Sequence, residues 1–312
     1  MLPNKNIINL IGPTATGKSQ LACEIAKKYH LPILNVDSLL LYNELTIGVA
    51  KPSIEQRSEV PHYLIDVTSI AHPFTAADYV EMALPLIESL WDQHQTIMLV
   101  GGSGFYLKAL LEGMFESKTT PPDILQKSQS IFEKEGIDYF INILQNHDIK
   151  SFQSLHVNDH YRIRRAVEHF WTTGIPFSKE KELMPLREPQ WKKLGWNLTN
   201  LYLDFPKFEH GKIIEQRTKG MLENGLIDEV KNLLRTFSGK EKPLQSIGYK
   251  ECQEFLNTNS TIPDIKTLQE RIIISTRQLA KSQRTWFAKI EKIHLPPDDI
   301  KRWKIINDLF IS

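Results

Sequence analysis

The sequence of 312 residues contains only two cysteines, Cys23 and Cys252, and they lie far apart. Two distant cysteines form neither a disulfide framework nor a zinc-binding cluster. No uninterrupted apolar run approaches the length that spans a membrane. The first apolar strand pattern begins within about six residues of Met1, which leaves no room for a targeting peptide. We therefore expect a cytoplasmic protein without a membrane partner.

An excess of charge of one sign is also absent. The chain has 38 Lys and Arg residues against 37 Asp and Glu residues, so its net charge is +1. A nucleic-acid site must therefore be a local basic patch. An apolar fraction of 41% and a charged fraction of 24% are typical of a globular protein of one large or two smaller domains. The oligomeric state is not readable from the sequence, and a monomer is the default expectation.

A phosphate-binding loop lies near the N-terminus. Residues 12–19 read GPTATGKS and match G-x-x-x-x-G-K-[ST] at every fixed position. An apolar run, Ile7–Ile11, precedes the loop, and a helical pattern follows it. Backbone N–H groups at a helix N-terminus would bind a diphosphate, Lys18 a terminal phosphate, and the Ser19 hydroxyl Mg²⁺. The predicted diphosphate site comprises Gly12, Pro13, Thr14, Ala15, Thr16, Gly17, Lys18 and Ser19.

One component of an ordinary P-loop ATPase is missing. Such enzymes place a metal-binding Asp at the end of a later strand. Here the later strand pattern Thr96–Val100 continues into glycines and a serine without an acid. Two other strand-like runs end in an acid, at Asp37 and Asp66. The sequence thus predicts a diphosphate site and leaves γ-phosphate chemistry open.

The order of apolar patterns predicts an α/β fold. Short apolar runs alternate with helical patterns up to Gly113, which indicates a P-loop core with a parallel sheet and flanking helices. We assign residues 1–114 and 196–312 to this core. Residues 115–195 show helical patterns alone and predict an all-helical inserted domain. Lys212–Leu234 and Leu268–Lys289 predict two long helices in the second part of the core.

Eight short motifs resemble, in order, those of one family, the tRNA dimethylallyltransferases, also called tRNA isopentenyltransferases. Eight ordered matches are very improbable by chance. The absence of a C-terminal zinc finger resembles the bacterial members. The matching segments are GPTATGKS at 12–19, DSLLLY at 37–42, IGVAKP at 47–52, PHYLID at 61–66, GGSGFY at 101–106, RIRRAVE at 162–168, GYKE at 248–251 and RQLAKSQRTW at 277–286.

The resemblance implies a reaction. A dimethylallyl group passes from dimethylallyl diphosphate to N6 of adenosine 37 in the anticodon loop of a tRNA, and diphosphate leaves. Mg²⁺ is the only cofactor implied. The loop at 12–19 would then hold a prenyl diphosphate and not ATP, which accounts for the missing metal-binding acid.

Three residues match the family's catalytic groups. The exocyclic amine of adenine is a poor nucleophile and needs a proton acceptor, and Asp37 matches the family's general base. Ser103, where the family has Thr, and Arg217 match groups that approach the leaving diphosphate. From the residues alone, Asp37 could instead cap a turn or bind a metal. Arg217 could be a solvated helix charge.

The resemblance also implies which residues contact tRNA. Within the insertion, three arginines lie close together at 162–165, although Asp159 and Glu168 could pair with them one turn away. Near the C-terminus, Arg277, Lys281 and Arg284 share one helix face, which suits an RNA backbone or a solvated surface. The predicted tRNA-binding residues are Asp37, Ser38, Leu39, Leu40, Ser103, Tyr161, Arg162, Ile163, Arg164, Arg165, Gln245, Ser246, Ile247, Gly248, Tyr249, Lys250, Arg277 and Lys281.

The chain departs from the family pattern at four positions. Thr46 stands for Asp, Val49 for Thr, Leu125 for Arg and Ser282 for Arg, and Lys127 could substitute near Leu125. None of these changes removes a proposed catalytic group.

Three other functions remain open. An adenylate isopentenyltransferase would share the loop but use free nucleotides. The helical insertion and the basic closing helix favour tRNA instead. A P-loop kinase would need the missing metal-binding acid. A non-catalytic RNA-binding protein would not need an intact phosphate loop.

Overall fold

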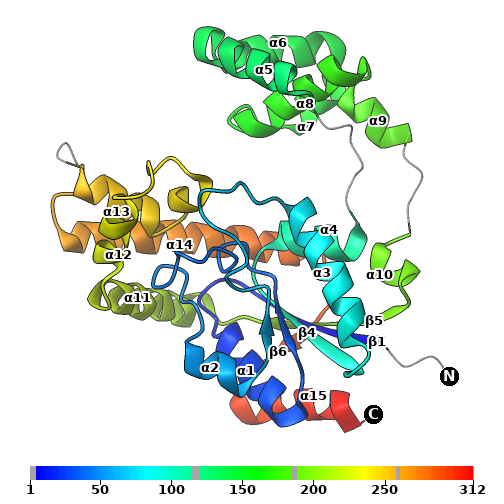
Figure 1. Cartoon of the computed structure of the whole chain (residues 1–312), viewed down its shortest axis with the longest axis vertical. Helices are drawn as coiled ribbons and strands as arrows, with labels where there is room; N and C mark the ends of the chain where they lie inside the picture. Colours follow the sequence, from blue (N-terminus) through cyan, green and yellow to red (C-terminus); the bar gives the residue numbers. More distant parts are fainter. Residues whose placement is uncertain (1–4, 114–119, 184–187, 258–260, 312) are drawn as a thin grey trace. The chain divides into compact units, whose positions relative to one another are not determined.

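The computed structural model describes residues 5–113, 120–183, 188–257 and 261–311. Over these ranges the chain divides into two compact units, Met1–Gly113 with Pro189–Ser312, and Met114–Glu188. The first unit contains the sheet, and the second contains only helices among its described residues (Figure 1). The division after residue 188 precedes the one expected from the sequence, because α10 (Gln190–Lys193) packs against β5 and α4 of the first unit.

The predicted parallel sheet is confirmed. Across the described residues, six parallel strands form one sheet in the order β3-β2-β4-β1-β5-β6. Parallel strands end at a common edge, so the loops that follow β1, β2 and β4 meet where open α/β sheets bind ligands. The strands are β1 (Lys5–Ile11), β2 (Ile33–Asn35), β3 (His62–Tyr63), β4 (Thr96–Val100), β5 (Trp196–Leu203) and β6 (Ile293–Leu295).

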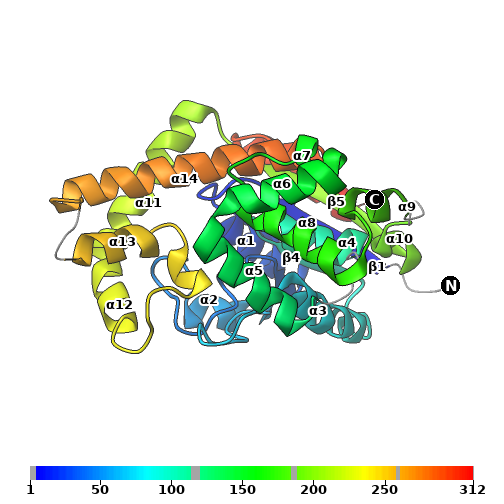
Figure 2. The ribbon, with the colours of Figure 1, turned by 90° about the horizontal axis from the view of Figure 1, so that it is seen from above.

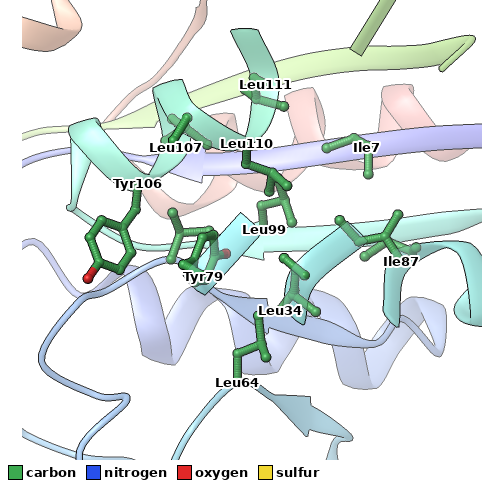
Figure 3. Packing of buried hydrophobic residues seen from close by; sticks show 14 of the residues in the cluster. Ile7, Leu34, Leu64, Tyr79, Ile87, Leu99, Tyr106, Leu107, Leu110 and Leu111 are labelled. Carbon is green, nitrogen blue, oxygen red and sulfur yellow. The ribbon is translucent and has the colours of Figure 1, made fainter. Parts of the chain in front are cut away.

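Both faces of the sheet are covered by helices. Successive strand side chains point to opposite faces. Ile7 and Leu99 pack with Tyr79 of α3 and with α4 (Figure 3). Ile8 and Leu10 pack with α1 and α15. Full burial of such a side chain contributes about 1.5–3 kcal/mol, so these two layers hold the loop edge rigid. The covering helices are α1 (Lys18–Tyr29), α3 (Ala76–Leu90), α4 (Gly104–Glu112) and α15 (Asp299–Ile311).

A further group of helices in the same unit surrounds a separate apolar core with the segment that follows β2. The long helix α14 lies beside α11 (Figures 1 and 2). The expected single helix over Lys212–Leu234 is wrong, because Gly225, at φ 96°, separates α11 from α12. These elements are α11 (Lys207–Glu223), α12 (Leu226–Leu233), a 3₁₀ turn (Lys242–Gln245), α13 (Tyr249–Leu256) and α14 (Ile265–Phe287). The short helix α2 (Ile54–Glu59) has no buried residue and lies outside this core.

The helical unit has its own small core of Phe140, Leu144, Ile163, Ala166 and Val167. The carboxylate of Asp159 accepts a hydrogen bond from the backbone N–H of Arg162 and so begins α8. Within the described ranges, no helix has both the length and the apolarity needed to cross a membrane. The helices are α5 (Pro122–Glu135), α6 (Ile137–His147), α7 (Ile149–Ser154), α8 (His160–Thr173) and α9 (Phe177–Leu183).

Candidate active site

The phosphate-binding loop joins β1 to α1, as the sequence predicts. Gly12 has φ 152°, and a Cβ atom there would lie 2.1 Å from the carbonyl oxygen of Leu203, so only glycine fits. Gly17 has φ 78° and caps α1. Ala15 also has a positive φ, 61°. The loop therefore folds tightly around the N-terminus of α1, where backbone N–H groups and the helix dipole favour an anion.

Lys18 is buried in this loop. Its Nζ donates to the carbonyl oxygen of Pro13 at 2.5 Å, and the Thr16 hydroxyl donates to the same oxygen at 2.9 Å. Burial lowers the pKa of Lys18 to about 8, while the carboxylate of Asp37 opposes this shift and Arg217 adds to it. A bound anion would offset the desolvation of the ammonium group, so the loop is suited to a negatively charged ligand.

Asp37 lies in a tight turn after β2. The side chain of the buried Asn35 accepts from the Asp37 N–H at 2.8 Å and donates to the Asp37 carbonyl at 2.9 Å. One carboxylate oxygen of Asp37 accepts from the Leu39 N–H at 3.0 Å. The turn is thus fixed by Asn35, and the half-buried carboxylate of Asp37 is a group that can accept a proton.

Ser103 follows β4 and contacts the same turn. Gly101 passes so close to the β2 end that a Cβ atom would lie 2.3 Å from the carbonyl carbon of Val36. The Ser103 hydroxyl accepts from the Ser38 N–H at 3.0 Å and lies 3.2 Å from the Ser38 hydroxyl. The glycine loop therefore supports the turn that carries Asp37.

Arg217, from α11, lies against the phosphate loop. Its Nη1 is 3.4 Å from the Thr14 hydroxyl. Burial lowers the pKa of the guanidinium, and the carboxylate of Asp37 opposes that shift. Lys18 and Arg217 are thus two cationic groups within electrostatic range of one carboxylate. This arrangement can neutralise a diphosphate beside a proton acceptor.

Four further residues support the phosphate-binding loop, and the sequence does not predict this role for them. Gln283 and His210 hydrogen-bond to the backbone of Thr14, and Arg284 joins His210 to Asp204. Arg284 is expected from the sequence to lie on a basic surface stripe, but it is held at the loop instead. No local pattern marks His210 or Asp204, because their roles depend on packing between distant segments.

Asp66, the second acid expected at a strand end, does not face the loop. It pairs with Lys51 and, at 2.7 Å, with Arg57, and its strand β3 is at the edge of the sheet. In the part of the chain that the structure describes, no three His, Cys, Asp or Glu side chains form a metal-binding cluster. Ser19, the residue for which the sequence predicts a metal contact, is exposed at the start of α1.

The predicted tRNA-binding residues of the sheet unit are only partly exposed. Tyr249 is fully buried, and its hydroxyl donates to Glu229, which also accepts from the N–H groups of Thr46 and Ile47. This tyrosine therefore fixes a loop and does not present a surface to RNA. Leu40 is buried as well.

The remaining residues of these stretches, apart from the buried Gly248, are at least partly accessible. Arg277 pairs with Glu215 of α11 at 2.6 Å, and both side chains are about half exposed. Ser38 and Leu39 are half-buried, as are Ser246 and Ile247, whereas Gln245, Lys250 and Lys281 are exposed. Gly248, at φ 92°, begins α13.

The stretch Tyr161–Arg165 of the helical unit has two kinds of side chains. Tyr161 and Arg162 are 75% and 72% exposed. Ile163 is in the core, and Arg164 lies over the ring of Phe132 and donates to Ser128. Arg165 pairs with the buried Glu168 at 2.9 Å. The ion-paired face expected as the alternative to RNA contact is therefore present, and Arg162 is the most exposed of the three arginines.

At the positions that depart from the family pattern, the side chains are exposed or contact residues of their own unit. The Lys127 ammonium lies 4.6 Å from the ring centroid of Trp171, so it packs within the helical unit. The Ser282 hydroxyl donates to the Gln278 carbonyl of its own helix. Thr46 is exposed, and Val49 packs at the edge of the apolar core that α11 to α14 form with the segment after β2.

A family model and curated relatives identify the same family for this chain. Residues 40–290 match the family model described as IPP transferase. The chain is 38% identical over 288 residues to a tRNA dimethylallyltransferase of Acaryochloris marina, covering 92% of this chain and 91% of the relative. It is 35% identical over 299 residues to one of a Synechococcus species, covering 95% and 93%.

Two solved structures are similar to this chain. The tRNA isopentenylpyrophosphate transferase of Bacillus halodurans has a TM-score of 0.68 at 27% identity, covering 98% of this chain and 96% of that chain. A eukaryotic dimethylallyltransferase acting on tRNA has a TM-score of 0.80 at 23% identity, covering 99% and 78%, and indicates the fold alone. From the family model and from relatives aligned over nine tenths of its length, the chain belongs to the IPP transferase family.

Proposed function

We propose that this chain transfers a dimethylallyl group from dimethylallyl diphosphate to N6 of adenosine 37 in tRNA and releases diphosphate. The observation that carries the proposal is the position of Lys18 and Arg217 within electrostatic range of Asp37 at one sheet edge. Membership in the IPP transferase family supports the reaction, since the relatives are named tRNA dimethylallyltransferases.

The loop residues would bind the leaving group. As the carbon–oxygen bond breaks, charge develops on the diphosphate, and Lys18, Arg217 and the loop N–H groups would stabilise it. The exposed Ser19 hydroxyl fits a Mg²⁺ ion shared with the diphosphate, because Mg²⁺ commonly keeps water and few protein ligands. Such an ion would supply further neutralisation of the leaving group.

Asp37 would act on the nucleophile. Its carboxylate would accept the N6 proton as the new carbon–nitrogen bond forms, which removes the positive charge from the product amine. The Asn35 side chain and the Ser103–Ser38 hydrogen bond would hold the carboxylate in place. The adenine must leave the stack of the anticodon loop, at a cost of about a few kcal/mol.

The tRNA would contact exposed groups. Tyr161 and Arg162 of the helical unit, and Lys250 and Lys281 of the sheet unit, are accessible for stacking or phosphate contacts. The buried Tyr249 and Ile163 would act indirectly by fixing their segments. We expect a monomer to suffice, because each catalytic group proposed here comes from one chain.

The deciding experiment incubates the protein with dimethylallyl diphosphate and Mg²⁺, and with either an anticodon stem-loop RNA or AMP. Mass analysis of the nucleosides is expected to find one dimethylallyl group on the adenosine 3′ to the anticodon and none on AMP. Prenylation of AMP alone would instead identify an adenylate isopentenyltransferase. Phosphate transfer from ATP would identify a kinase, and RNA binding without transfer a non-catalytic protein.

A further inference from the structure

Both backbone polar groups of Thr14 are held by side chains from distant segments. Its N–H donates to Oε1 of Gln283 at 2.7 Å. Its carbonyl oxygen is 2.8 Å from Nε2 of His210. The Thr14 N–H is therefore not directed at a ligand, although the sequence places Thr14 among the predicted diphosphate-binding residues. The anion site must use the N–H groups that follow it in the loop.

Gln283 connects two loops with one carboxamide. While its oxygen accepts from Thr14, its Nε2 donates to the carbonyl oxygen of Gly102 at 2.9 Å. A Cβ atom on Gly102 would lie 2.6 Å from that nitrogen, so the glycine leaves the space that the carboxamide occupies. Gln283 thus sets the separation between the phosphate loop and the loop that carries Ser103.

His210 is oriented by an arginine. Arg284 donates two hydrogen bonds of 2.7 Å to the carboxylate of Asp204, and its Nη2 lies 2.6 Å from Nδ1 of His210. A guanidinium has only donors, so Nδ1 must accept, and the proton of the neutral ring lies on Nε2. His210 therefore donates to the carbonyl oxygen of Thr14. Burial of the ring lowers its pKa and favours the neutral form.

We propose that Gln283 and His210 are positioning residues for donor binding, which together preset the phosphate loop for the diphosphate of the prenyl donor. The inference rests on the proposed function, because it assigns these residues to the same site. A preset loop loses little conformational freedom when the anion binds, and its N–H groups need not reorient during the reaction. Neither residue has to touch the donor.

The main test replaces Gln283 by Glu in the full-length protein. The carboxylate still accepts from Thr14 but offers Gly102 no donor, so two oxygen atoms face each other. We expect the KM for dimethylallyl diphosphate and the Kd for magnesium pyrophosphate to rise about 10- to 100-fold, as is usual when a buried polar group loses its partner. The KM for the RNA should change less than twofold. Gln269→Glu, the same change at a half-exposed site on the same helix, is the matched control.

Two outcomes would overturn the inference. One is an unchanged pyrophosphate Kd and donor KM for Gln283→Glu. The other is an equal rise of both KM values with a lower Tm, which would indicate a purely structural role. Calorimetry with pyrophosphate does not require catalysis, so a wild-type protein that binds pyrophosphate without prenyl transfer would count against the proposed function alone.

His210 provides an independent test through a conservative replacement. In His210→Gln the side-chain amide can still donate to Thr14, whereas His210→Ala removes the donor. We expect the alanine variant to lose donor affinity about tenfold and the glutamine variant to recover most of it. Equal loss in both variants would contradict the assigned hydrogen bond.

Discussion

The hydroxyl of Ser103 accepts a hydrogen bond of 3.0 Å from the backbone N–H of Ser38, 65 residues earlier in the chain. This bond joins the glycine loop after β4 to the turn after β2. That turn also carries Asp37. Ser103, which is expected to approach the diphosphate, therefore also stabilises the turn that holds Asp37, which is expected to accept the proton.

Ser103→Ala should slow transfer without unfolding the protein. The change leaves the partly buried N–H of Ser38 without its partner, which costs about 1–3 kcal/mol. We expect a fall of about tenfold or more in the single-turnover rate. Ser103→Thr keeps the hydroxyl and serves as the control, with a rate close to that of the wild type. Equal rates in the alanine variant and the wild type would exclude a supporting role for the hydroxyl.

Asp37→Asn separates proton transfer from the structure of the turn. The amide oxygen of Asn can still accept from the Leu39 N–H, so the turn should keep its shape. Loss of a general base typically lowers a rate by about 10²–10⁴-fold. We expect that loss in single turnovers, with a Tm near that of the wild type and with pyrophosphate binding retained or tightened, because a negative charge near the anion site is removed. A near-normal rate in this variant would remove Asp37 from the role of base.

The parts of this site that the sequence predicts are those encoded locally. GPTATGKS requires a strand, a tight turn and a helix in direct succession, and the structure has all three in the predicted places. The parallel sheet follows from the alternation of apolar runs and helical patterns. The break between α11 and α12 also has a local cause, because Gly225 adopts a positive φ between the two helices that the sequence predicts as one.

The parts that the sequence does not predict depend on contacts between distant segments. Gln283 and Thr14 are 269 residues apart, and His210 and Thr14 are 196 apart. Spacing alone places Arg284 on a basic face, whereas the structure turns it toward Asp204. The strand β6 has three residues, two of them exposed, and therefore shows no alternation that would mark it.

The affinity for diphosphate should decline in alkaline solution. The pKa of Lys18 is lowered to about 8, chiefly by burial. Below this pH the ammonium group is charged and attracts the anion; above it, the neutral amine does not. We expect the Kd of pyrophosphate to be flat from pH 6.5 to 7.5 and to rise toward tenfold per pH unit above about pH 8. Titration calorimetry in buffers of equal ionic strength measures this dependence.

Two outcomes separate this explanation from others. In Lys18→Met the affinity should be low at every pH, and the break near pH 8 should disappear. A break that persists in that variant would belong to another group.

The stability of the ligand-free protein should change in the opposite sense. Between pH 8 and the ordinary lysine pKa of 10.5, the unfolded chain holds more protons than the folded one, so the contribution of Lys18 to stability increases with pH.

Arg162 and Arg164 should respond differently to alanine substitution, although both are on α8. Arg162 is 72% exposed, with Asp159 as its ion-pair partner. Arg164 lies 4.7 Å from the ring centroid of Phe132 and donates to Ser128. We therefore expect Arg162→Ala to raise the KM for tRNA with an unchanged Tm. Arg164→Ala should destabilise the helical unit by about 1–2 kcal/mol.

Salt dependence distinguishes a phosphate contact from an indirect effect. Each phosphate contact to single-stranded RNA contributes about 0.7 to the slope of log affinity against log salt. Arg162→Ala should reduce that slope by about this amount between 50 and 200 mM salt, measured by tRNA binding to the full-length protein. The ion pair with Asp159 is also lost, so Asp159→Asn is the control and should leave the slope unchanged or steeper. If Arg162→Ala leaves the slope unchanged, its charge does not contact the tRNA backbone, and the arginines of α8 serve only the helical unit.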